Sequence, residues 1–347
     1  GSILATWQRG GWVGVDLFFV LSGFLVSSLL IKEGLRTGQI SLTRFLTRRG
    51  FKIYPGFYVL LATSIVLGYL LGEPYTTRQM FGDLTFTQNY LGGRWAHTWS
   101  LAVEEHFYLM LPLCFLILAR WRGDMVKGFH WIPMIFIVAA IGCLALRIGM
   151  GWKVHSYGRY NVHFQTQFRL DALLMGVLLA YVYHCRAELF RSSAKYSRWF
   201  ALAGVVGLTP AFLFAVDEYF TIQTLGLTLF YVASALLVTA MLHRPLPTSR
   251  PVMFLAYIGQ HSYSIYLWHL PLIFWGLPAL ASAIGGASVA ANLLFCIVGC
   301  PLFGIAAAKA IEFPALRLRD RWFPRTGKAF ELSGEPTRSA LPIPEAV

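Results

Sequence analysis

Long apolar stretches separated by short polar connections run through most of this 347-residue chain. Most of the stretches are long enough for a membrane-spanning helix, which needs roughly 20 residues. The pattern predicts an all-α, polytopic transmembrane helix bundle with nine visible helices. The apolar segments lie near residues 12–31, 54–72, 99–119, 131–149, 170–184, 199–216, 221–241, 252–280 and 287–311.

Two of these segments are irregular. The 170–184 segment is short for a span, so we expect it to extend at both ends. The 252–280 segment contains Pro271 and Pro278, which favour a kink or an end before Gly285. We expect one transmembrane domain over 1–328 and a polar, proline-containing tail over 329–347.

Composition supports a membrane protein. Hydrophobic residues make up 56% of the chain and charged residues only 13%, with a mean hydropathy of +0.58. A soluble domain carries about 25% charged residues, so an ordinary soluble domain is excluded. The net charge of +13 could suggest a nucleic-acid partner, so the placement of the charges decides the matter.

Basic residues alternate between the loops. The five segments 32–52, 120–127, 186–198, 243–250 and 312–328 together hold twenty Lys and Arg residues. The opposite set holds six, namely Arg9, Arg78, Arg94, Lys153, Arg159 and Arg169. By the positive-inside rule the first set is cytoplasmic. The charge therefore indicates contact with membrane lipids and no nucleic-acid partner.

This orientation has a topological consequence. Nine spans with a cytoplasmic C-terminus place residue 1 outside, yet residues 1–11 do not resemble a cleavable signal peptide. We therefore expect ten helices in the intact fold, with the first of them absent from this chain.

The first apolar segment carries an acidic residue, Asp16. At helical spacing it shares a face with Phe19, Gly23 and Ser27. An intramembrane carboxylate is expensive to bury and usually serves a function. Gly23 and Ser27 form a pair of small residues that lets another helix approach closely. We predict a functional role for Asp16 and a packing role for Gly23.

A second acidic motif opens the third apolar segment, where Glu104 and Glu105 are adjacent. Ser100, Glu104 and Phe107 share one helical face, and Tyr108 lies at its edge. Either Glu104 is functional, or both acids mark a helix start at the membrane surface. Glu105 points roughly 100° away, which favours the surface position for that residue.

The connection before the second apolar segment is basic, with Arg48 and Arg49 among interleaved aromatic residues. Such a segment can anchor to anionic lipid headgroups. It can also bind a polyanionic cytoplasmic substrate such as a nucleotide diphosphate, because guanidinium groups match phosphate geometry. The residues alone leave both interpretations open.

Six stretches of the chain form a recognisable series of motifs. They are 14–25 (GVDLFFVLSGFL), 48–55 (RRGFKIYP), 98–108 (TWSLAVEEHFY), 168–176 (FRLDALLMG), 258–269 (IGQHSYSIYLWH) and 311–314 (IEFP). Together, and in this order, they resemble the acyltransferase-3 family of membrane proteins. Six matches in order are specific, although each match alone is weak.

The resemblance implies a bacterial inner-membrane enzyme of about ten helices. Such an enzyme takes an acyl group, often acetyl, from cytoplasmic acyl-CoA and places it on a hydroxyl of an envelope glycan or lipid-linked sugar. Acyl-CoA (acetyl-CoA) would be the co-substrate, with Arg48 and Arg49 as candidates to hold its phosphates. Asp16 and Glu104 would be catalytic, with Glu104 binding the acceptor or orienting a histidine, and Ser100 and Tyr108 would line the site.

One part of the family pattern has no match here. The family carries a catalytic histidine in the helix before its Gly-Val-Asp stretch, and His97, His261 and His269 do not occupy that position. The helix inferred to be absent would carry it. We therefore expect the chain as written to be inactive.

Further candidates follow along the chain. Arg169 and Asp171 at a helix mouth suit either substrate contact or a structural ion pair. His269 shares a helical face with Ser262 and Tyr266, and is either a substrate-binding residue or a packed core histidine. For Glu312 we favour a capping or ion-pair role.

Other chemistries have little support in the sequence. There is no His, Cys or Asp cluster with metal-ligand spacing, so no metal is predicted. The buried acids and arginines would also suit a transporter or flippase for a charged or glycosidic substrate. A sensor or assembly protein is a weaker alternative. A transporter would not transfer label from acyl-CoA to an acceptor.

Overall fold

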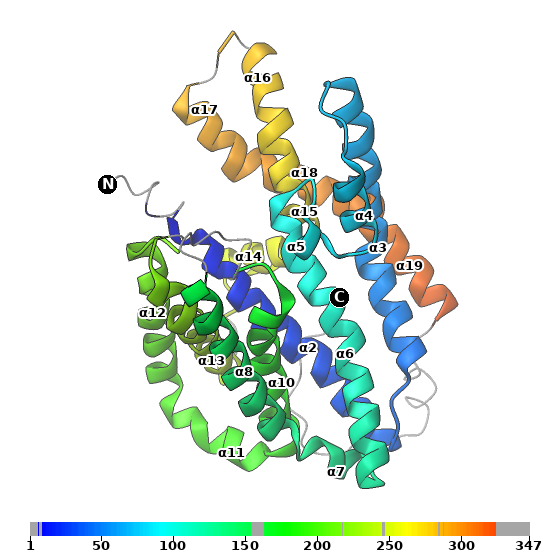
Figure 1. Cartoon of the computed structure of the whole chain (residues 1–347), viewed down its shortest axis with the longest axis vertical. Helices are drawn as coiled ribbons and strands as arrows, with labels where there is room; N and C mark the ends of the chain where they lie inside the picture. The colour runs from blue at the N-terminus through cyan, green and yellow to red at the C-terminus, as the bar shows by residue number, and fades with distance from the viewer. Residues whose placement is uncertain are drawn as a thin grey trace. The chain divides into compact units, whose positions relative to one another are not determined.

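The computed structural model describes residues 6, 9–153, 163–216, 218–244, 247–283, 285–286 and 288–323. Within these ranges all regular secondary structure is helical (Figure 1), which confirms the predicted all-α class. The chain divides into two compact units, residues 1–42 with 75–246 and residues 43–74 with 247–347. The predicted tail at 329–347 lies outside the described ranges, and the single domain over 1–328 stays a prediction.

Each unit is a set of helices joined by short turns. The helices of the first unit are α2 (Gly14–Thr37), α4 (Thr77–Leu84), α5 (Gln88–Leu91), α6 (Trp99–Arg122), α7 (Met125–Phe129), α8 (Ile132–Lys153), α10 (Leu170–Cys185), α11 (Ala187–Ser192), α12 (Ser197–Leu213) and α13 (Leu227–Leu242). Those of the second unit are α3 (Leu42–Leu70), α14 (Arg250–Gln260), α15 (Ser262–Pro271), α16 (Leu277–Ala283), α17 (Val289–Leu294), α18 (Cys300–Ala307) and α19 (Phe313–Trp322).

Seven helical stretches of the described chain are long and apolar enough to cross a membrane. They are Gly11–Thr37, Leu42–Leu70, Ala96–Arg122, Met125–Gly151, Ile222–Leu242, Ser262–Ala283 and Val289–Trp322. The remaining two predicted segments form α10 and α12. Their 16 and 17 residues reach about 25 Å at 1.5 Å per residue, less than the ~30 Å hydrocarbon core. Helix α10 and the stretch Ala187–Leu213, which contains α11 and α12, are bent by 99° relative to each other. Counted together as one span, they would be the eighth. The chain is an integral membrane protein.

The two irregular segments differ in outcome. The expected extension of 170–184 is wrong, because non-helical backbone at Arg169 (φ −130°) and Arg186 (φ −129°) bounds α10. The expected irregularity of 252–280 is confirmed. A turn at His261 separates α14 from α15, and a π-helical turn follows Pro271, whose ring nitrogen cannot donate a helix hydrogen bond.

Helix α2 is the axis of the first unit and contacts α6, α7, α10 and α13 (Figure 1). Its closest approach is to α10. A Cβ atom added to Gly23 would lie 2.0 Å from the Leu173 carbonyl oxygen, and one added to Gly176 would lie 2.3 Å from the Val20 carbonyl oxygen. The predicted packing role of Gly23 is therefore confirmed, and Asp16 is buried on the same helix.

The second unit is held by polar contacts among α3, α15 and the C-terminal helices. The Tyr263 hydroxyl on α15 donates to the Ile53 carbonyl on α3 at 2.6 Å. Lys52 forms an ion pair with Glu312, which also accepts a hydrogen bond from Ser264 at 2.7 Å. Glu312 is buried, so this contact confirms the ion-pair role predicted for it.

The 75–98 segment forms a small polar layer within the first unit. The Asn89 side-chain amide donates to Thr166 Oγ1 at 2.9 Å, and the His106 ring on α6 hydrogen-bonds to the same hydroxyl at 2.7 Å. Asp83 is 3% exposed, and its Oδ2 accepts from the Arg94 backbone amide at 3.1 Å. These contacts fix the chain that leads into α6.

Burial raises the pKa of Asp83 to about 6, although hydrogen bonds from Arg94 and Tyr75 partly oppose the shift. The Asp83 carboxyl group of the folded segment therefore stays protonated at pH values where the same group in the unfolded chain has already released its proton. We predict that stability of the 75–98 segment falls as pH rises from about 4 to about 6 and then levels off. Hydrogen exchange of these amides, corrected for intrinsic rates, measures this. In Asp83→Asn the dependence should vanish, and an unchanged pH profile in that variant would contradict the assignment.

Candidate functional site

Glu104 lies in a cluster of hydroxyl groups between α2 and α6. Its Oε1 accepts short hydrogen bonds from the Ser22 and Tyr108 hydroxyls, which are themselves 2.9 Å apart. Tyr108 follows Glu104 by one turn of α6, as the spacing predicted, whereas Ser22 comes from α2. All three side chains are buried, Glu104 being only 4% exposed.

The neighbouring motif residues are also inside the protein. Ser100 is fully buried and donates to the His97 carbonyl oxygen at 3.3 Å. Glu105 is 8% exposed, so protein covers it, and its position at the membrane surface stays a prediction. The face of α6 that carries Glu105, roughly 100° from Glu104, is therefore also covered by protein, which periodicity along one helix could not reveal.

Asp16 forms an ion pair with Arg169. The distance from Arg169 Nη2 to Asp16 Oδ1 is 2.8 Å, and the two side chains are 1% and 0% exposed. Asp16 lies in the first turn of α2 and Arg169 precedes α10, so the pair ties together the starts of these two helices. The sequence proposed both residues for the site but did not pair them with each other.

The Arg169 guanidinium also lies near two aromatic rings. Its Cζ atom is 5.7 Å from the ring centroids of both Phe19 and Trp99. The two rings meet edge to face at 5.7 Å. Trp99 begins α6, so Arg169 connects the start of that helix to α2 and α10. Contacts between a guanidinium group and aromatic faces contribute about 0.5–2 kcal/mol each.

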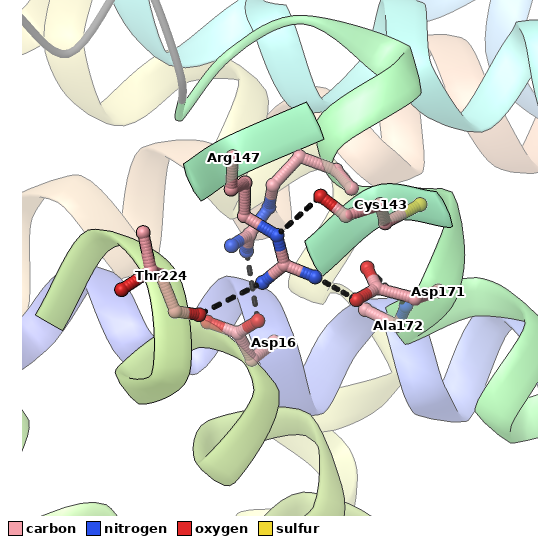
Figure 2. A network of polar contacts seen from close by, with 7 residues as sticks. Asp16, Cys143, Arg147, Asp171, Ala172 and Thr224 are labelled. Carbon is pink, nitrogen blue, oxygen red and sulfur yellow. Dashed lines mark hydrogen bonds and ion pairs between the residues drawn. The ribbon is translucent and has the colours of Figure 1, made fainter. Parts of the chain in front are cut away.

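A second buried arginine, Arg147 of α8, pairs with Asp171 (Figure 2). The Arg147 side chain also donates to the Cys143 carbonyl oxygen at 3.2 Å and to the Thr224 carbonyl oxygen at 3.3 Å. Asp171 Oδ1 accepts from the Ala172 backbone amide at 3.1 Å. Both Asp171 oxygens are therefore engaged, which supports the ion-pair interpretation of this residue over direct substrate contact.

Two atoms of the Asp16–Arg169 pair remain open. Asp16 Oδ2 and Arg169 Nε are buried and have no hydrogen-bond partner among the described residues. One is an acceptor and the other a donor. Because buried polar groups nearly always find partners, the pair has the capacity to bind a hydroxyl or carbonyl group.

The predicted phosphate-binding arginines belong to the second unit. The Arg48 guanidinium contacts Asp320 at 3.2 Å and donates to the Phe323 carbonyl oxygen at 2.9 Å. These contacts hold it at the end of α19. Arg49 is half-buried beside it. The Arg48–Asp320 pair is exposed enough for exchange with another anion, since surface ion pairs contribute only about 0–1 kcal/mol.

His269 lies on α15 of the second unit. Its Nδ1 hydrogen-bonds to the Tyr266 carbonyl oxygen of its own helix at 2.5 Å. This contact favours the packing interpretation. The structure thus collects Asp16, Ser100, Glu104, Tyr108, Arg169 and Asp171 in the first unit, and Arg48, Arg49 and His269 in the second.

Two residues in these clusters were not predicted as site residues. Ser22 matched the family stretch, but nothing in the periodicity of α2 indicates that its hydroxyl meets Glu104. Arg147 did give a signal, because it is the one charged residue within the apolar segment 131–149. Only the fold shows that its partner is Asp171.

Comparison with known proteins identifies the family. A model described as an acyltransferase domain matches residues 2–310. The chain is 33% identical over 295 residues to the O-acetyltransferase OatA of Staphylococcus aureus, covering 78% of this chain and 47% of that protein. It is 28% identical over 302 residues to the peptidoglycan O-acetyltransferase OatA of Listeria monocytogenes, covering 79% and 47%.

The chain therefore spans about half the length of these curated relatives. No solved structure matches it. The family match covers most of the chain and includes Asp16, Glu104, Arg147, Arg169 and Asp171. The resemblance found in the sequence motifs is confirmed: this chain belongs to the acyltransferase-3 family of membrane proteins.

Proposed function

We propose that the full-length protein with this acyltransferase domain transfers an acyl group, most simply acetyl, from cytoplasmic acyl-CoA to a hydroxyl of an extracytoplasmic or lipid-linked glycan. The relatives support the reaction class, because they are named O-acetyltransferases and one acts on peptidoglycan by its name. The excess of basic residues in alternate loops supports the orientation that gives acyl-CoA access from the cytoplasm. In a bacterium this membrane would be the inner membrane.

The observation that carries the proposal is the open acceptor and donor of the Asp16–Arg169 pair. We assign Asp16 Oδ2 to accept the hydrogen bond of the glycan hydroxyl, and Arg169 Nε to donate to the developing oxyanion of the acyl carbonyl. The hydroxyl oxygen attacks the acyl carbon, the carbon–sulfur bond breaks, and the hydroxyl proton ends on the CoA thiol. A buried guanidinium stabilises such charge more than water does.

Glu104 of α6 contacts α2 at Ser22, which lies six residues from Asp16, about 9 Å along the helix axis and about 120° around it. We assign Glu104 to the part of the site that binds the acceptor glycan. There its carboxylate orients either the catalytic histidine of the family pattern or the glycan itself, through Tyr108 and Ser22. Ser100 and Tyr108 line this region and stay predicted substrate-binding residues. Asp171 and His269 have partners in their own surroundings, so we give them no step in the reaction.

A transporter or flippase is the second candidate function. Buried charges such as Asp16, Glu104, Arg147, Arg169 and Asp171 in the first unit also occur along translocation paths. The two functions differ in covalent outcome, because only an acyltransferase moves label from acyl-CoA to the glycan. Appearance of the glycan across the membrane without label would favour transport.

The test uses vesicles that contain the full-length protein and are given labelled acetyl-CoA, with glycan acetylation read by mass spectrometry. Glu104→Gln should lower turnover by roughly 100-fold or more, the typical loss for an acid–base group, while the vesicles still bind acyl-CoA. Glu105→Gln is the matched control, with the neighbouring carboxylate changed instead, and should retain most activity. Near-normal turnover in Glu104→Gln would refute its role.

A second prediction concerns Arg48. If its guanidinium leaves Asp320 to bind a CoA phosphate, Arg48→Ala and Arg49→Ala should each raise the acyl-CoA KM by roughly tenfold or more. Charge-assisted contacts of this kind contribute about 1.5–3 kcal/mol. Asp320→Asn should lower the KM, since it removes the competing carboxylate.

Arg317→Ala serves as the control for this series, because Arg317 is an exposed cation on the same helix α19. The KM should stay at the wild-type value in that variant. An unchanged KM in well-inserted Arg48→Ala would show that Arg48 anchors α19 and does not bind acyl-CoA.

A further inference from the structure

Arg147 has no place in the reaction proposed above, yet it is among the most deeply buried side chains of the described chain. It is 0% exposed and lies within an apolar helix. A charged group at such a position is expensive, and evolution rarely retains it on a helix that could carry Leu instead. We therefore expect the contacts of Arg147 to show why the protein retains a charge at this position.

The contacts of Arg147 hold its guanidinium in one place. Two carbonyl oxygens accept from it, one on its own helix at Cys143 and one at Thr224 (Figure 2). Thr224 lies within the π-helical turn Ile222–Gly226, before α13. The third contact, to Asp171, provides the opposite charge. Arg147 thus joins α8 to α10 and to the start of α13.

Asp171 lies close to both arginines. It pairs with Arg147, but it also interacts electrostatically with Arg169, two residues earlier in the chain. Asp16 in turn interacts with both arginines and with Asp171. The four side chains therefore form one neutral group of two cations and two anions, in which the pairing is not fixed by charge alone.

The consequence is a competition for Arg169. Without Arg147, Asp171 would be a buried carboxylate with Arg169 as its remaining cation. A buried carboxylate without a counter-charge is strongly unfavourable, so Asp171 would draw the Arg169 guanidinium away from Asp16. The open acceptor and donor at Asp16 and Arg169 would then separate.

We propose that Arg147 is a positioning residue, which occupies Asp171 so that Arg169 stays paired with Asp16. Arg147 touches no substrate. Its effect on the reaction passes through Asp171 and Arg169, and this part of the argument rests on the proposed function. Which carboxylate each arginine pairs with does not depend on that function and can be measured separately.

The experiment compares Arg147→Met, Asp171→Asn, the double variant of both, and Arg147→Lys, in vesicles of the full-length protein. A membrane-permeant carbodiimide labels buried carboxyl groups that lack a cation, and peptide mapping distinguishes Asp16 from Asp171. Asp16 labelling should rise at least tenfold in Arg147→Met. It should return to the wild-type value in the double variant, because Asp171 no longer competes for Arg169.

Turnover should be lowest in the variant in which Asp16 labelling is highest. Arg147→Met should lower kcat by roughly 100-fold with little change in the acyl-CoA KM, and the double variant should recover to within about tenfold of wild type. Removing both partners of a purely structural ion pair can also restore folding, so the discriminating readout is Asp16 labelling, which a purely structural arginine would leave at the wild-type value in Arg147→Met. A double variant that is folded but as inactive and as strongly labelled as Arg147→Met would overturn the proposal.

Arg147→Lys keeps the experiment decisive if Arg147→Met does not reach the membrane. Lysine retains the charge that neutralises Asp171 but cannot reproduce the fork of guanidinium contacts. Asp16 labelling should therefore stay low in this variant, and strong labelling would contradict the proposal. If the wild-type protein transfers no acetyl group, the proposed function fails, whereas the labelling pattern still tests the role of Arg147.

Discussion

Four charged side chains enclosed in apolar helices must neutralise one another, and this requirement determines how the first unit is assembled. Asp16, Arg147, Arg169 and Asp171 come from the starts of α2 and α10 and from the interior of α8. Removing one partner of a buried pair costs about 3–5 kcal/mol, a large part of the stability of a typical domain. The helices are therefore locked in one arrangement, in which the close approach at Gly23 and Gly176 brings the pairs together.

The same arrangement joins two different kinds of polar group on α2. Asp16 meets a cation, whereas Ser22 meets the carboxylate of Glu104 and the hydroxyl of Tyr108. Trp99 and Phe19 lie beside the Arg169 guanidinium and are themselves buried, so the charge is enclosed by aromatic surface as well as by its partner. A preorganised, dry site of this kind suits acyl transfer, because fixed donors need not reorient as charge develops.

Much of this fold could be predicted from the sequence. The helical class, the positions of the apolar segments and the inward face of Asp16 and Gly23 follow from periodicity and composition. The ion-pair role of Glu312 followed from its charge at the end of an apolar run. The partners did not follow, because Arg147 meets Asp171 and Lys52 meets Glu312 through contacts between different helical segments. The burial of Glu105 and the bend between α10 and α12 are also set by tertiary packing, which local patterns do not encode.

The central claim is that the Asp16–Arg169 pair holds the reacting groups of an acyl transfer, and Asp16→Asn tests it most directly. Asparagine keeps the shape of the side chain and removes its charge. In vesicles of the full-length protein given labelled acetyl-CoA and glycan acceptor, single-turnover transfer should fall by roughly 100-fold or more in this variant. Because the substitution also removes one partner of a buried pair and so lowers stability, transfer is measured per folded protein that binds acyl-CoA. Transfer at the wild-type rate in a folded Asp16→Asn protein would contradict the account.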